Sequence, residues 1–366
     1  MWVKIMLERF KVPDTDKVYI QSDKIFELTK NILKDLGVSD EGASNSASVL
    51  IENDLRGVES HGVSNGLRLY INRYLDGTYN PKPKMKILKE TPTTAKIDGD
   101  NALGTEIGPI AMQIAIDKAK RYGMGSVSVI NTGHLAGCGF YALQAAQNDM
   151  VGHCYTGSPA GQTLPTWGSE PILGTNPVAW AAPANDMPAF LFDIATSQVA
   201  GNKIELTRRT GAKLLPAWIA DKSGNPIMDE IETPDKGEYN LLPFGGTREN
   251  GSHKGYGLGL VAEIMSNILS GAGPGLFNDH QGSDYFAAYS VDAFTDVKKF
   301  KDDMDLLLKK IIDSKPAKGF DRVVYAGYLE NEEFTKRSSK GIPYHKEVID
   351  WFRSYCSESE VDFNLD

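Results

Sequence analysis

Two short apolar runs, at 126–130 and 151–155, flank a glycine-rich turn and a helix-forming segment at 140–148. An uninterrupted apolar run of this length is typical of a buried strand. Strand, helix and strand in this order predict a βαβ unit, whose sheet is covered by helices. The chain is therefore expected to adopt an α/β fold, and its 366 residues are enough for two domains.

The first 80 residues differ from this pattern because they predict helices only. Ser22 is expected to cap an amphipathic helix that ends at Gly37, and further helices are expected at 41–56 and around 67–74. Two prolines, Pro81 and Pro83, end this helical lobe. Beyond it, the patterns predict strands at 86–88, 94–97, 178–182, 191–194 and 322–325, and helices at 108–122, 255–270, 300–312 and 345–355.

Composition argues against several classes of protein. A net charge of −9 opposes binding to a nucleic-acid backbone. Three cysteines without repeated spacing indicate neither a disulfide framework nor a zinc site, so no metal is expected. The first eleven residues lack the apolar core of a signal peptide, and no apolar run is long enough to span a membrane. We therefore expect a cytoplasmic protein with neither a membrane nor a nucleic-acid partner.

The turn after the first apolar run, Gly137 to Ala142, matches the G-x-G-x-x-A pattern of dinucleotide-binding turns. Such a turn presents backbone N–H groups at a helix start, where a phosphate can bind. The acid that binds the ribose in that motif is missing, because no Asp or Glu lies between Asp149 and Glu170. Close packing of a helix on a strand explains the glycines equally well, so the motif does not establish a Rossmann fold.

Two histidines in glycine-flanked turns are candidates for proton transfer. His61, within Ser60-His61-Gly62, lies between two predicted helices, and His134 lies in the turn after the first apolar run. An imidazole can give or take a proton near neutral pH, as the reduction of a carbonyl group requires. Each ring could instead serve its own turn, as a hydrogen-bonded or capping side chain.

Two charged residues are candidates for contacts with a charged ligand. Lys254 opens a long apolar helix, where a cation opposes the helix dipole, so an anionic partner such as a phosphate is expected nearby. A surface lysine is the alternative. Asp193 ends an apolar strand and could accept hydrogen bonds from ribose hydroxyls or cap the next segment.

Five short motifs occur in one order along the chain. They are Asp54-Leu55-Arg56-Gly57 with Ser60-His61-Gly62, Gly133-His134 with Gly137, Gly174-Thr175-Asn176-Pro177, the segment from Asp193 to Ser197, and the segment from His253 to Leu258. Together they resemble the malate/L-lactate dehydrogenase family over about residues 13–352. That family is unrelated to the classical Rossmann lactate dehydrogenases. It includes ureidoglycolate and sulfolactate dehydrogenases, 2,3-diketo-L-gulonate reductase and piperideine-2-carboxylate reductase.

The resemblance implies a non-Rossmann NAD(P)-binding α/β fold of the sulfolactate dehydrogenase type, in which the helical N-terminal lobe packs with the C-terminal segment. It implies a helical lobe at 1–80 joined by 295–366, and an α/β region at 81–294 that binds cofactor and substrate. The implied activity is the transfer of a hydride between NAD or NADP and a small 2-oxo or 2-hydroxy carboxylate, as in malate or lactate. A homodimer is also implied.

The resemblance further implies roles for single residues. His61 and His134 are the expected acid/base residues, and Ser60 is expected to assist. The expected cofactor-binding residues are Ser158, Asn176, Phe192, Asp193, Ile194, Lys254 and Gly327.

Two positions depart from the family pattern. Asn65 stands where many members carry an arginine that grips the substrate carboxylate, and Arg68 is the expected substitute because an amide cannot form a bidentate ion pair. The Pro-Gly-Glu cofactor loop of the family is replaced here by Ala326-Gly327-Tyr328. These departures leave two alternatives open: an NAD(P)H-dependent cyclic imine carboxylate reductase, and a non-catalytic binding protein on the same fold.

Overall fold

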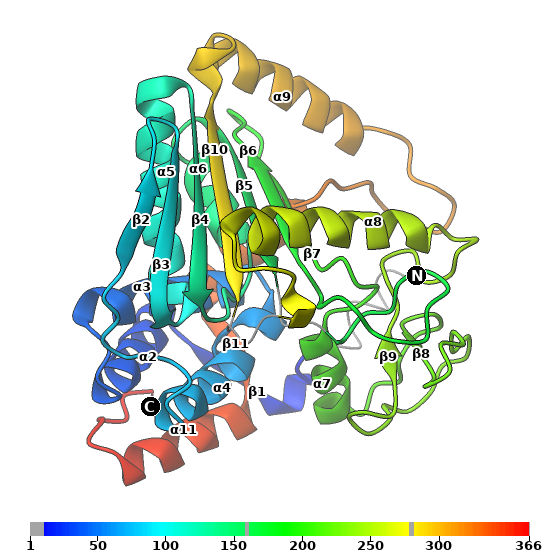
Figure 1. Cartoon of the computed structure of the whole chain (residues 1–366). Coiled ribbons are helices and arrows are strands. Elements are labelled where there is room, and N and C mark those ends of the chain that lie inside the picture. Colours follow the sequence, from blue (N-terminus) through cyan, green and yellow to red (C-terminus); the bar gives the residue numbers. More distant parts are fainter. Residues whose placement is uncertain (1–10, 158–160, 278–281, 366) are drawn as a thin grey trace.

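A central mixed sheet of seven strands organises the molecule in the computed structural model, which describes residues 11–157, 161–277 and 282–365 (Figure 1). Its strands, from one edge to the other, are β2 (Lys86–Glu90), β3 (Thr94–Ala102), β4 (Met124–Thr132), β10 (Ser283–Ser290), β5 (Met150–Gly157), β6 (Val178–Ala182) and β7 (Phe190–Ile194). Only β3 and β4 pair in parallel, and all other neighbours are antiparallel. The predicted α/β class is therefore confirmed, with a sheet that is mixed rather than parallel.

The predicted βαβ unit is present in order but not in pairing. β4, α6 (Gly139–Ala146) and β5 follow one another, and β4 and β5 run in the same direction, yet β10 lies between them and pairs with both. The sequence did not predict β10, because its run from Ser283 to Ser290 begins with a serine and an aspartate. In the structure its residues from Ser283 to Ser290 are half-buried or buried, as expected of the central strand of a sheet.

Helices cover both faces of this sheet. α5 (Gly104–Tyr122) and α6 pack on one face, while α8 (Ser252–Glu263) and the π-helical turn η3 (Ile264–Ile268) cross the other (Figure 1). Glycines on β4 and β5 allow α5 and α6 to pack closely on the sheet. A Cβ at Gly125 would lie 2.1 Å from a carbonyl oxygen of α5, and one at Gly152 would lie 2.3 Å from a carbonyl oxygen of α6. The core therefore lies between this pair of helices and the middle strands.

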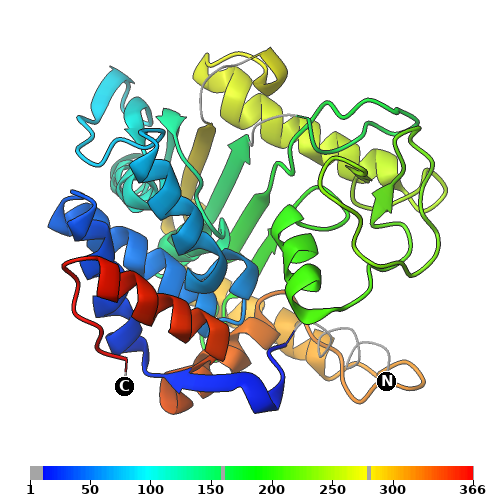
Figure 2. The same ribbon diagram turned by 90° about the horizontal axis from the view of Figure 1, so that it is seen from below.

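A helical layer lies below the sheet and contains both ends of the described chain (Figure 2). It is formed by α2 (Ser22–Asp35), α3 (Asp40–Leu55), α4 (Val63–Leu75), α10 (Tyr328–Lys340) and α11 (Lys346–Glu358). β1 (Lys17–Ile20) pairs antiparallel with β11 (Ile342–His345), so the two ends of the chain are joined. The expected packing of the N-terminal helices with the C-terminal segment is confirmed. The boundaries at residues 80 and 295 stay a prediction.

The remaining elements lie at the periphery. α7 (Gly201–Thr210), β8 (Ile219–Ala220) and β9 (Asn240–Leu241) enclose a small separate core that includes Ile204 and Trp218. α9 (Val297–Ile312) lies at the end of the sheet opposite the helical layer (Figure 1). The single-turn helices are η1 (Asp14–Asp16), η2 (Glu59–His61), η4 (Gly275–Phe277) and η5 (Val291–Ala293). The strand predicted at 322–325 is wrong, because those residues form an irregular connection before α10.

Within the described ranges, the model contains no helix that is long and apolar enough to cross a membrane.

Candidate active site

His61 lies on η2, the tight turn that joins α3 to α4. The turn passes directly over the carboxyl group of Asp54, the penultimate residue of α3, whose Oδ2 accepts a hydrogen bond from the N–H of Val63 at 2.9 Å. A Cβ at Gly62 would lie 1.7 Å from Asp54 Oδ1, so this position has room only for glycine. The motif Ser60-His61-Gly62 therefore reflects close packing as well as chemistry.

His134 lies on the turn between β4 and α6, at the end of the sheet that faces the helical layer. Here too the backbone is crowded, because a Cβ at Gly104 would lie 2.4 Å from the carbonyl oxygen of Gly133. The hydroxyl group of Tyr70, on α4, lies 2.7 Å from His134 Nδ1, and the N–H of Ala136 donates to the same nitrogen at 3.3 Å. Nδ1 is therefore engaged, and Nε2 is the atom left for a substrate.

The structure brings the two histidines together from turns that are 73 positions apart in the sequence numbering. Their ring centroids are 5.8 Å apart and the ring planes differ by 19°. Ser60 Oγ lies 2.9 Å from His61 Nδ1, so Ser60 also belongs to this cluster. The geometry is that of one reacting centre, and the roles predicted for the three side chains remain a prediction.

Both imidazoles are neutral at pH 7. Burial and, to a lesser extent, the neighbouring His134 together lower the pKa of His61 to about 3. The residue His134 is partly accessible to solvent, but its ring is surrounded by protein atoms. The resulting loss of hydration lowers the pKa of His134 to about 4. A neutral ring can accept a proton from a hydroxyl group.

The predicted Rossmann-like turn does not offer a phosphate site. The carboxylate of Asp193, at the end of β7, accepts a hydrogen bond from the N–H of Gly139 at 2.7 Å. This acid caps the start of α6, where a dinucleotide phosphate would have to bind, and its negative charge would repel one. Asp193 was expected to cap the segment that follows it, but it caps α6, which precedes it in the sequence, and its contact with the ribose stays a prediction.

Other predicted cofactor-binding residues lie on or beside β7, or at the start of α8. Phe192 and Ile194 flank Asp193 on the strand, and Gly327 abuts its start, because a Cβ there would lie 2.8 Å from Leu191 Cβ. Lys254 is exposed in the first turn of α8, whose start has no side-chain cap. Such a positive helix end with an exposed ammonium suits the phosphates of a dinucleotide. Ser158 lies outside the described residues.

The side chain of Asn176 connects two elements of the fold. Its side chain is fully buried, and Nδ2 donates to the carbonyl oxygen of Gly259 and to Glu263 Oε2, at 3.2 and 3.1 Å. It thereby ties the entry to β6 to helix α8. The Nδ2 atom of Asn176 is thus engaged with α8, and the role of this residue at the cofactor stays a prediction.

Both predicted substrate-binding residues are engaged with other groups of the protein. Asn65 Nδ2 donates to the carbonyl oxygen of Glu59 at 3.1 Å. Arg68 forms an ion pair with Glu347 at 2.7 Å and lies over the Trp351 ring at 4.6 Å. Because Tyr70 of the same helix points at His134, a residue two positions away points to the opposite side. Arg68 is therefore bound to α11, and it does not replace the missing arginine in this arrangement.

Sequence reasoning missed several residues that surround the histidines. Tyr70 occupies a regular inward position of an amphipathic helix, so the pattern suggested a core residue. Asn202 Nδ2, at the start of α7, donates to the carbonyl oxygen of Ser60 at 3.0 Å. Arg337 and Tyr344 reach the same turn from α10 and β11. Their contacts join segments far apart in the sequence, for which a single sequence holds no signal.

Among the residues that the structure describes, no group of three or more acidic, histidine or cysteine side chains could hold a metal ion. The cysteines at 138, 154 and 356 are free and buried.

Comparisons with known proteins agree with this arrangement. The family model described as malate/L-lactate dehydrogenase matches residues 20–353. The chain is similar to a malate dehydrogenase of Pyrococcus abyssi, with 38% identity over 347 residues that cover 92% of this chain and 94% of the relative. It is also similar to an L-sulfolactate dehydrogenase of Methanocaldococcus jannaschii, with 37% identity over 91% of this chain and 94% of the relative.

Solved structures show the same relationship. The crystal structure of malate dehydrogenase from Entamoeba histolytica superposes with a TM-score of 0.88 and 33% identity, covering 95% of this chain and 99% of that one. The resemblance noted from five motifs is thereby confirmed over nearly the whole chain. By sequence and by fold, the chain belongs to the malate/L-lactate dehydrogenase family.

Proposed function

We propose that this protein is an NAD(P)-dependent oxidoreductase that interconverts a small 2-hydroxy carboxylate and its 2-oxo form, with His61 and His134 at the reacting centre. The observation that carries the proposal is the pair of neutral imidazoles, 5.8 Å apart, on two glycine-flanked turns. NAD or NADP, when bound, supplies or accepts the hydride. The named relatives, a malate and a sulfolactate dehydrogenase, support a hydroxy acid as substrate.

The protein's own contribution is to handle the proton and to hold the substrate. In the oxidation of a hydroxy acid, a neutral ring accepts the hydroxyl proton. In the reduction of an oxo acid, a ring must first take up a proton, and the negative substrate favours that step because it stabilises an imidazolium nearby. Because Nδ1 of His134 accepts the hydrogen bond from the Ala136 N–H, its neutral ring carries the proton on Nε2, which can donate to a substrate oxygen. His61 is then the neutral ring that accepts the hydroxyl proton.

The substrate carboxylate still needs a cation, and Lys203 is our candidate. It follows Asn202, whose side chain binds the backbone of Ser60, so the start of α7 lies next to the histidine turn. Burial lowers the pKa of Lys203, and an anion beside it would offset that cost. Lys203→Met is expected to raise KM for the oxo acid about tenfold or more while the Kd of NADH stays unchanged. Lys213→Met, on an exposed lysine beyond α7, is the control, and equal effects of both variants would exclude Lys203.

A kinetic screen tests the proposed reaction. Oxidation of NADH and of NADPH is followed with oxaloacetate, pyruvate, 2-oxoglutarate and sulfopyruvate as substrates. The purified wild-type protein is expected to turn over at least one of them, and His61→Ala is expected to abolish turnover but retain binding of the reduced cofactor. Full activity in His61→Ala would refute the role of this histidine.

The same screen separates the two alternatives. Activity on piperideine-2-carboxylate with none on oxo acids would identify a cyclic imine carboxylate reductase. No turnover of any substrate, with no thermal shift on addition of NADH or NADPH, would identify a non-catalytic protein on this fold.

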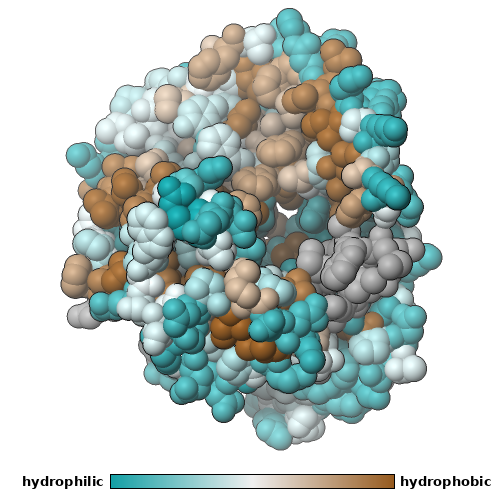
Figure 3. All heavy atoms as spheres, turned by 90° about the vertical axis from the view of Figure 1, so that its right-hand side faces the viewer, coloured by the Kyte–Doolittle hydropathy of each residue, from teal (hydrophilic) through white to brown (hydrophobic). Residues whose placement is uncertain are grey.

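We also infer a homodimer in the cytoplasm. Four large apolar side chains along α8 and η3 are 37 to 50% exposed, namely Leu260, Val261, Ile264 and Ile268. Brown apolar side chains also gather across the upper part of the face toward which α8 and α9 extend (Figure 3). Contiguous apolar surface of this kind is typical of protein contacts. Ile264→Lys is expected to lower the mass measured by light scattering from that of a dimer to that of a monomer, and a wild-type monomer would contradict the inference.

A further inference from the structure

The turn that carries His61 is held mainly by the last part of the chain. We call residues 57–63 the His61 turn. Arg337, on α10, donates from Nη1 to the carbonyl oxygen of Asp54 at 2.7 Å, from Nη2 to Glu59 Oε1 at 2.8 Å and from Nε to Glu333 Oε2 at 2.9 Å. It is only 5% exposed. One buried guanidinium thus binds both the end of α3 and the first residue of η2.

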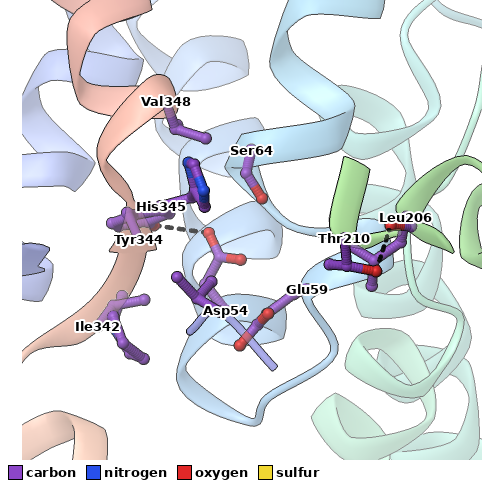
Figure 4. A pocket seen from close by; sticks show the side chains of 11 residues that line it. Asp54, Glu59, Ser64, Leu206, Thr210, Ile342, Tyr344, His345 and Val348 are labelled. Carbon is purple, nitrogen blue, oxygen red and sulfur yellow. Dashed lines mark hydrogen bonds between the residues drawn. The ribbon is translucent and has the colours of Figure 1, made fainter. Parts of the chain in front are cut away.

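Tyr344, on β11, reaches the same place from another side. Its hydroxyl group donates to Asp54 Oδ2 at 2.6 Å, and the N–H of Val63 donates to the same oxygen at 2.9 Å. In Figure 4 the Asp54 carboxyl group lies between Tyr344 on the C-terminal strand and Glu59 on the turn. Asp54 is fully buried, and its other oxygen lies against Gly62. The carboxyl group therefore links β11 to the backbone that directly follows His61.

The surroundings of this link are closely packed. The cavity beside Asp54 and Glu59, also lined by Tyr344 and Leu206, has a volume of about 20 Å³, which is room for about one water molecule. Close-packed interiors transmit a displacement to their neighbours instead of absorbing it. A change at Tyr344 or Arg337 is thus expected to move the His61 turn.

We infer that Asp54, Tyr344 and Arg337 are positioning residues of the active site, which place the Ser60–His61 pair against His134 through the His61 turn. The inference rests on the proposed function, since the pair matters only where it reacts. None of the three contacts the imidazole rings directly. Their effect is geometric, and a shift of about 1 Å in a reacting group can cost about a hundredfold in rate.

The protonation of Asp54 supports this assignment. Burial raises its pKa to about 7, while the hydrogen bonds from Tyr344 and Val63 and the charge of Arg337 act in the opposite direction, and Glu59 adds to the rise. His345 lines the same small cavity. A carboxyl group that is neutral below pH 7 is mimicked by asparagine, which keeps an acceptor oxygen for both donors. This equivalence makes Asp54→Asn the conservative variant.

The first experiment removes a single hydroxyl group. Tyr344→Phe is expected to lower kcat about tenfold, to leave the Kd of NADH within about twofold of wild type, and to shift the imidazole NMR signal of His61. Tyr355→Phe is the matched control, because that tyrosine lies on α11 of the same C-terminal segment and packs on Trp351. The control is expected to change none of the three quantities.

The second experiment distinguishes position from mere stability. Asp54→Ala removes the acceptor and is expected to lower kcat by tenfold or more, while Asp54→Asn is expected to retain kcat within about threefold below pH 7. Any step in the wild-type rate near pH 7 that arises from Asp54 disappears in Asp54→Asn. Arg337→Lys is not expected to retain the wild-type kcat, because an ammonium group cannot reproduce the geometry in which the guanidinium binds three acceptors.

Two outcomes would overturn the inference. One is a folded Tyr344→Phe protein with wild-type kcat and an unchanged His61 signal. The other is a folded Asp54→Ala protein that is as active as Asp54→Asn. The NMR measurement does not depend on turnover, so a wild-type protein that reduces no oxo acid refutes the proposed function alone. If Asp54→Ala does not fold, Tyr344→Phe alone decides the matter.

Discussion

The two histidines of the proposed site are held in place by different parts of the molecule. His134 sits where β4 meets α6, and the side chains that hold it, Tyr70 and Tyr79, come from one neighbouring helix and its C-terminal connection. His61 sits on a single turn between two helices, and the groups that hold it come from positions 202, 337 and 344. One ring therefore lies at the end of the sheet and is held by α4 and the connection that follows it, and the other is held by segments from later in the sequence. The site is complete only when both supports are in place.

The largest expected effect is the loss of either ring. His134→Ala is expected to reduce kcat by about 10² to 10⁴, the usual contribution of a general acid or base, and His61→Ala to do the same. Steady-state kinetics with the best oxo acid measures this, and fluorescence titration with NADH checks that the cofactor site survives. A small loss in one variant would show that the two rings are not equal partners.

A second test adds one methyl group in the crowded backbone beside each histidine. Gly62→Ala would place a Cβ 1.7 Å from Asp54 Oδ1, and Gly104→Ala would place one 2.4 Å from the carbonyl oxygen of Gly133. Each turn must then move, and kcat is expected to fall about a hundredfold in both. Gly257→Ala, on α8, is the control, because nothing lies within 4 Å of the added atom. Wild-type kcat in either strained variant would show that its turn tolerates displacement.

A milder change tests how His134 is held. Tyr70→Phe removes the hydroxyl group that lies 2.7 Å from Nδ1, so the ring keeps only the weaker contact with Ala136. The expected result is a fall in kcat of about fivefold to tenfold with KM little changed, because one hydrogen bond is worth about 1 kcal/mol. A pure rise in KM would instead place Tyr70 in contact with the substrate.

The smallest expected effect concerns stability. Asp284 of β10 is 1% exposed beside the hydroxyl groups of Thr132 and Thr156, and burial raises its pKa to about 7. Because the unfolded chain loses this proton near pH 4, the wild-type protein loses stability as the pH rises from about 4 to about 7. Asp284→Asn cannot ionise, so its Tm relative to wild type is expected to be higher at pH 8 than at pH 5. An equal difference at both pH values would contradict the shifted pKa.

The sequence predicted the elements that are determined by interactions between residues close together in the chain. The helices at 22–35, 40–55 and 104–122, the strands at 124–132 and 150–157, and the two histidine turns follow from apolar periodicity, caps and glycines. The strand β10 and the pair β1–β11 were missed, since each is defined by its partners rather than by its own residues. A strand that begins with Ser283 and Asp284 resembles a loop until its neighbours are known.

The sequence predicted that the two histidines lie together, but it did not predict the residues that hold them. Both imidazoles were expected to meet, and they do. Arg68 was expected at the substrate, but its ion pair with Glu347 depends on α11, whose position no local pattern reveals. Asp193 fitted a ribose contact by its place at a strand end, and only the distance of 2.7 Å to the N–H of Gly139 shows that it caps α6. Long-range contacts decide such roles.

The position of β10 has a consequence for how the chain folds. β4 and β5 leave a gap between them, and the strand that fills it begins at residue 283. While the protein is being synthesised, more than a hundred residues emerge after β5 before this gap can close, and both flanking strands expose unpaired edges during that time. The nascent chain is thus most vulnerable to aggregation just before its last quarter appears, and a chaperone that shields strand edges would help most in that interval.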